Sequence, residues 1–213
     1  MGKIEELSEA LCNVRKAHRI IYSYQQRILS LMKFISAKLN FVNNFMGVKH
    51  FSNDIRKKRD GYLDIHENMW AWDFLYSYVF EYYLGEQEIE GGDGIAISVV
   101  QFSDTGFFDS NSNNKTDVSA FTQEENSASK LLFVIERKPK TSDWLWNIKE
   151  IVNNKEYASR EHTCSILEQR GGIKQCLYSF DITDFIDEKS AVNSLRKLCN
   201  YCKEKEFADI KIV

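Results

Sequence analysis

The first 40 residues carry a regular apolar pattern with alternating steps of three and four residues. Apart from the polar His18 and Gln25, the repeating positions are apolar: Ile4, Leu7, Leu11, Val14, His18, Ile21, Gln25, Ile28, Met32, Ile35 and Leu39. This spacing is typical of the a and d positions of a heptad repeat, and residues 3–40 contain neither proline nor glycine. The pattern therefore predicts a long N-terminal helix, either continuous or folded into a helical hairpin.

A second apolar row beside this seam includes Ala10, Ala17, Tyr24 and Leu31. It makes the apolar face wider than a two-stranded seam and closer to that of a bundle helix. At 1.5 Å per residue, an unbroken helix would be roughly 57 Å long, whereas a compact chain of this length has a radius of gyration of about 17 Å. We therefore expect residues 4–39 to mediate homo-oligomer formation. His18 and Gln25 either set the register of that contact or lie at the edge of a broad face.

The remainder of the chain alternates between strand-like and helix-like patterns. Every even position from Trp70 to Leu84 is apolar, which favours a strand ended by Gly85, although the polar residues four apart also fit a buried helix. Strands are predicted over 95–102, 131–135, 176–182 and 208–213. Helices are predicted over 144–152, capped by Thr141 or Ser142, and over 188–203, capped by Asp184 or Asp187.

These elements predict an α+β fold, in which a long N-terminal helix precedes a mainly antiparallel sheet with two further helices. We divide the chain into an oligomerisation segment, 1–40, and an α+β domain, 41–213. A polar stretch near 104–129 is predicted to be a mobile surface loop, anchored by Phe107, Phe108 and Phe121.

Composition narrows the class of protein. The chain has 213 residues, a net charge of −3 and one proline, which excludes collagen-like and proline-rich classes. Near-balanced charge argues against a dedicated nucleic-acid-binding domain. It does not exclude nucleic-acid contact by a local basic patch, such as residues 56–59. Five cysteines without a visible signal peptide favour a reduced, cytoplasmic protein, and no stretch is apolar enough to predict a membrane span.

Glu136-Arg137-Lys138 is the strongest enzymatic candidate in the sequence. Over these three residues the chain resembles the motif of PD-(D/E)xK nucleases, in which a carboxylate and a lysine lie two residues apart on a strand. The resemblance implies a Mg²⁺ ion held by Glu136 and a second carboxylate, from Asp104 or Asp109, with Glu81 as a possible third. Lys138 would position or activate the attacking water. The alternative is that these three residues are the charged, solvent-exposed end of a buried strand and have no catalytic role.

A zinc site is the second candidate, because Cys199 and Cys202 form a CxxC pair and His162 and Cys164 lie upstream. Both CxxC cysteines fall on the inward face of a predicted helix, which favours their packing as small hydrophobes. We therefore assign no metal ligand and no cofactor. The leading hypothesis is an interaction or regulatory protein that self-associates through its N-terminal helix. The alternatives are the nuclease-like enzyme and a small-ligand module lined by the 70–84 aromatic segment.

Overall fold

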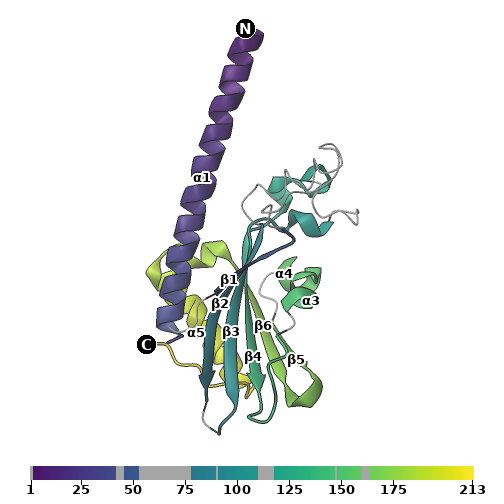
Figure 1. Cartoon of the computed structure of the whole chain (residues 1–213). Coiled ribbons are helices and arrows are strands. Elements are labelled where there is room, and N and C mark those ends of the chain that lie inside the picture. The colour runs from purple at the N-terminus through teal and green to yellow at the C-terminus, as the bar shows by residue number, and fades with distance from the viewer. Residues whose placement is uncertain are drawn as a thin grey trace. The chain divides into compact units, whose positions relative to one another are not determined.

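A computed structural model describes residues 2–41, 46–52, 78–89, 91–109, 118–146, 148–159 and 164–213 (Figure 1). The chain divides into two compact units, residues 1–35 and residues 36–213. Helix α1 spans Lys3–Lys38 without a break, so the first unit consists of a single helix. The continuous form of the predicted N-terminal element is therefore the one that the structure adopts.

The second unit is built around a six-stranded sheet in which every neighbouring pair is antiparallel. Its strands are β1 (Met46–His50), β2 (Val79–Glu88), β3 (Gly94–Phe102), β4 (Lys130–Lys138), β5 (Cys164–Glu168) and β6 (Lys174–Asp181). They lie in the order β1-β2-β3-β4-β6-β5, so that β4 occupies an interior position. The α+β class with a long first helix and an antiparallel sheet is thus confirmed.

Helices cover both faces of this sheet (Figure 1). Helix α5 (Glu188–Glu204) packs on one face, where Cys202 meets Cys176 and Tyr201 meets Tyr178. The short helices α3 (Ile148–Val152) and α4 (Lys155–Ser159) lie on the other face. There Ile148 and Val152 join the apolar cluster formed by the sheet. Burial on both faces explains why β3 and β4 are nearly continuous apolar runs.

Strand β2 continues past Gly85, which was expected to end it. The register between β2 and β3 shifts between Tyr83 and Gly85, and Gly85 has a φ of 122°. Glycine adopts this conformation without a steric penalty. The extra residue of the bulge is Leu84, and the ladder resumes at Gly85, which pairs with Ile97. The even positions from 80 to 84 belong to a strand as expected, whereas residues 70–77 lie outside the described part of the chain.

Of two other sequence predictions, the helix over 144–152 is confirmed only for α3, Ile148–Val152, and the strand over 208–213 is wrong. Residues 139–146 precede α3 without forming a helix, because Glu136 binds backbone N–H groups there and Trp146 adopts a φ of 41°. Residues 208–213 form no strand. Arg137 binds the carbonyl oxygens of Glu206 and Phe207, just before this segment, and the segment joins no ladder. Strands β1 and β5 were not predicted.

In its described residues, the polar stretch after β3 forms the short 3₁₀ turns η1 (Thr105–Asp109), η2 (Val118–Ala120) and η3 (Glu124–Asn126). Its expected anchors are confirmed, because Phe107 is buried and Phe108 and Phe121 pack against the same apolar cluster. The basic run 56–59 lies outside the described residues. Among the helices that the structure describes, none has the length and apolar character needed to cross a bilayer.

Candidate functional site

Glu136 lies near the end of β4 with its side chain fully buried. Its carboxylate accepts hydrogen bonds from the backbone N–H of Leu145 at 2.8 Å and of Trp146 at 3.2 Å. A third hydrogen bond, of 2.8 Å, comes from the side-chain amide of Gln175, which pairs with Glu136 across β4 and β6. A buried carboxylate is tolerated when it accepts several such bonds, so Glu136 ties the segment after β4 to the sheet.

A second buried carboxylate, Glu81, projects from β2 on the same side of the sheet. It accepts hydrogen bonds from Ser98 Oγ at 2.6 Å and from the indole Nε1 of Trp146 at 3.1 Å. The imidazole of His50 lies 3.0 Å from its other oxygen. Burial alone raises the pKa of Glu81, but the hydrogen bonds from His50, Ser98 and Trp146, together with the charge on His50, outweigh burial and lower the pKa.

Trp146 therefore connects the two carboxylates, which come from strands β2 and β4. Its backbone N–H is bound by Glu136 and its indole N–H by Glu81. The indole ring meets Tyr83 edge to face, with the ring centroids 5.3 Å apart. Its φ of 41° is in the left-handed region, which is unfavourable for a bulky residue. We call Glu81, Glu136 and the side chains bound to them the carboxylate cluster.

Negative charge in the cluster also affects Tyr83. Burial, followed by the charges of Glu86 and Glu136, raises the pKa of the Tyr83 phenol. Apart from His50, the side-chain donors to the two carboxylates are neutral: Ser98, Trp146 and Gln175. The cluster is therefore a buried pair of carboxylates whose negative charge is compensated mainly by hydrogen bonds.

Lys138 follows Glu136 by two residues, and its ammonium group binds the segment after the strand. Nζ donates to the carbonyl oxygen of Ser142 at 2.7 Å and lies 4.9 Å from the ring centroid of Trp144. Both charged residues expected to act in a nuclease thus contact residues 139–146. We call this segment the strap.

The structure does not bring Asp104 to Glu136. Glu136 pairs with Ala96 near the start of β3, whereas Asp104 follows the end of β3 and accepts a hydrogen bond from the N–H of Gly106. Asp104 follows Ala96 by eight positions, which correspond to roughly 25 Å of extended chain. The side chain of Asp109 lies outside the described residues. Glu81, not Asp104, is the carboxylate that shares a partner with Glu136.

No metal centre emerges from the parts of the chain that the structure describes. Within them, no group of three or more His, Cys, Asp or Glu side chains is placed to hold an ion. Cys199 and Cys202 are buried on the inner face of α5, and burial first, then the neighbouring Cys202 and Asp209, raises the pKa of Cys199 to about 12. His162 and the side chain of Cys164 lie outside the described residues.

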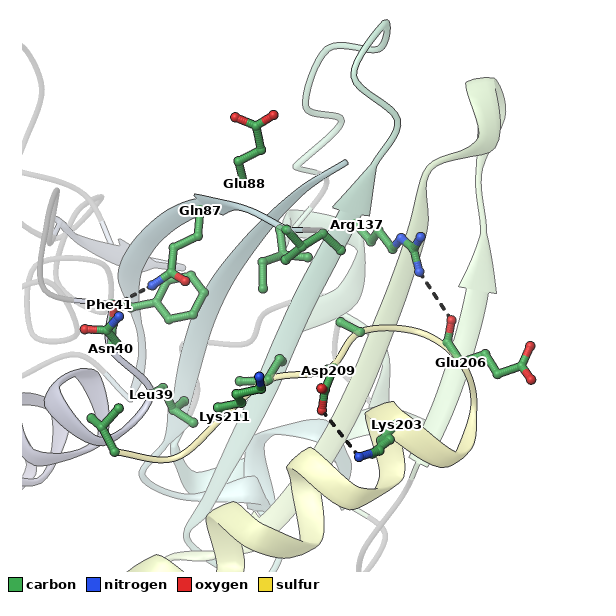
Figure 2. A pocket seen from close by; sticks show the side chains of 15 residues that line it. Leu39, Asn40, Phe41, Gln87, Glu88, Arg137, Lys203, Glu206, Asp209 and Lys211 are labelled. Atoms are coloured by element: carbon green, nitrogen blue, oxygen red, sulfur yellow. Dashed lines mark hydrogen bonds and ion pairs between the residues drawn. The ribbon is translucent and has the colours of Figure 1, made fainter. Parts of the chain in front are cut away.

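A separate pocket of about 740 Å³ lies between β2, β3 and the C-terminal segment (Figure 2). Its apolar lining includes Phe41, Ile95 and Ile210, and charged residues of both signs surround it. Arg137 lines this pocket but is neutralised by Asp93, at 2.8 Å, and donates to backbone carbonyls. Because positive and negative side chains both line the pocket, its charge does not favour either an anionic or a cationic ligand.

Sequence reasoning identified Glu136 and Lys138 but missed Trp146, Gln175 and Ser98 as members of the cluster. Glu81 and Ser98 interrupt apolar strands, and Glu136 also occupies a position that faces the core. Polar residues at core positions of neighbouring strands are a usable signal for a buried network. Their pairing depends on strand register, which a single sequence leaves open.

Comparison with known proteins places the chain in one family. It belongs to the family described as PM0109, whose model matches residues 4–207. No curated protein and no solved structure matches the chain.

Proposed function

We propose that this member of the PM0109 family is an interaction protein that self-associates through residues 4–39. The observation that carries the proposal is the exposure of the heptad seam at the start of α1. Ile4, Leu7, Leu11 and Val14 have exposed fractions of 85%, 60%, 49% and 51%. Contiguous apolar side chains on a soluble surface are typical of an interaction site.

The first unit has no second element of its own against which this seam could pack. An isolated amphipathic helix gains most of its stability from packing of the apolar face, so the exposed part of the seam, from Ile4 to Val14, requires a partner surface. Ile28, Met32 and Ile35, farther along the seam, are already buried. A second copy supplies one with the same spacing, because a and d side chains pack into the facing helix. The self-associated form therefore accounts for apolar residues that are otherwise in water.

Charge along the helix favours an antiparallel pair. Apart from Lys3, the charged residues of the first turns are the acids Glu5, Glu6 and Glu9, whereas the basic residues Arg15, Lys16 and Arg19 follow. An antiparallel contact places the acidic start of one helix beside the basic part of its partner, and it also opposes the two helix dipoles. A parallel contact places like charges together.

The proposal is tested with a charge-insertion pair and a matched control. Leu7→Asp with Leu11→Asp adds two acids on the seam, and Asn13→Asp with Ser23→Asp adds two acids on exposed positions outside it. We expect the first variant to dissociate to one chain of 24.9 kDa in light scattering and the control to remain associated. A wild-type chain that is monomeric across concentrations would contradict the proposal.

We also propose a reducing, cytoplasmic location. Cys176 and Cys202 are buried with their sulfurs in hydrogen-bonding contact at 3.8 Å, and no disulfide joins them. Such close thiols fit a compartment that keeps cysteines reduced. The nuclease-like alternative stays a prediction that would require Glu81 in place of Asp104.

A further inference from the structure

The strap, residues 139–146, is attached to the sheet by polar contacts and by Trp146, which packs against the apolar cluster of the sheet. Leu145 and Trp146 donate to Glu136, Trp146 also donates to Glu81, and Ser142 accepts from Lys138 at 2.7 Å. The hydroxyl of Ser142 donates to the carbonyl oxygen of Gly171 at 3.1 Å. The strap itself is neither helix nor strand, so no ladder of backbone hydrogen bonds couples it to β4.

We propose that the strap opens as a local unit while the sheet stays folded, and that opening brings Glu81 and Glu136 into contact with solvent. This inference concerns the second unit alone and is independent of self-association through α1. Segments with few ladder bonds and few buried side chains are the usual sites of such partial opening. Trp146 is partly buried and Leu145 is exposed, whereas residues 130–136 of the strand β4 are buried.

Backbone strain at Trp146 favours the open form. A tryptophan at φ 41° holds an unfavourable conformation, which persists only while its contacts maintain it. In the closed form, the backbone N–H and the indole N–H each bind a carboxylate, and the ring contacts Tyr83. Opening releases the strain together with these contacts.

Solvation of the carboxylates also favours the open form. Closed, Glu136 is fully buried with three neutral N–H donors, and Glu81 is 4% exposed. Water can replace the strap as the donor to both groups once the strap moves away, because charged groups are strongly hydrated. Gln175 and Ser98 stay on the sheet and keep their bonds to the carboxylates in either form.

Hydrogen exchange of the full-length, ¹⁵N-labelled chain tests the proposal directly. We expect the amides of Leu145 and Trp146 to be protected at least about 100-fold relative to an unstructured peptide, since Glu136 binds both. We also expect them to exchange at least about tenfold faster than the slowest amides of β4. Exchange as slow as in β4 would show that the strap opens only on global unfolding. Exchange without protection would show that the closed form is not populated. Either result overturns the proposal.

Two variants give a matched comparison. Glu136→Gln keeps the shape of the side chain but weakens its bonds to Leu145 and Trp146, so we expect their exchange to accelerate by at least about tenfold. Glu150→Gln removes an exposed carboxylate on α3 and is expected to change neither strap nor β4. If Glu136→Gln does not fold, Lys138→Met removes the bond to Ser142 instead. Equal acceleration in the strap and in β4 would overturn the proposal in either variant.

Discussion

Removing the Glu136 side chain is expected to destabilise the second unit more than any exposed acidic residue would. Glu136→Ala leaves three N–H donors without their acceptor, namely the amides of Leu145 and Trp146 and the side-chain amide of Gln175. An unsatisfied buried donor costs about 1–3 kcal/mol. Gln175 is 1% exposed and bears this cost in full, whereas the strap amides recover part of it from water.

Loss of the buried charge offsets part of the penalty, because the carboxylate no longer has to be desolvated. We therefore expect the free energy of unfolding to fall by about 2–4 kcal/mol. Urea unfolding followed by tryptophan fluorescence measures this loss, with Glu150→Ala as the exposed control, expected within about 0.5 kcal/mol of wild type. A Glu136→Ala loss equal to that of the control would refute the account of the carboxylate cluster.

Three further predictions concern single side chains. Because the pKa of Glu81 lies below the ordinary 4.5, its stabilising contribution is complete above that value and is lost as the pH falls through the lowered pKa. As the pH is lowered, the unfolding free energy should therefore fall less steeply in Glu81→Gln than in the wild type. Because burial raises the pKa of Cys199 to about 12, Ellman's reagent should leave Cys199 unmodified in the folded chain while Cys12 reacts, as mass mapping would show. Arg137→Lys should lower the melting temperature measured by circular dichroism, since lysine cannot reproduce the paired contacts to Asp93; an unchanged value would count against that role.

The elements that sequence predicted correctly are those specified by local pattern. A run rich in β-branched residues located β3, and the cap of α5 follows from Asp187, whose carboxylate accepts from the N–H of Ser190 at 2.7 Å. Both signals involve residues close together in the chain, so they can be read from one sequence.

The strap shows where local pattern fails. Its caps and apolar spacing are typical of a helix, yet Glu136, nine residues before Leu145, binds the backbone N–H groups that would begin it. Tertiary contacts of this kind override weak helical propensity. The sequence pairs Glu136 with Asp104 or Asp109 and offers Glu81 only as a third carboxylate. The common partner of Glu81 and Glu136, Trp146, depends on strand register and on the bulge near Gly85.

The central claim, that the N-terminal helix mediates self-association, is tested most directly by the mass of the chain in solution. Sedimentation equilibrium of the wild type should give a mass of at least two chains of 24.9 kDa, falling to one chain in the Leu7→Asp, Leu11→Asp variant. A wild-type mass of one chain at every concentration would contradict the claim.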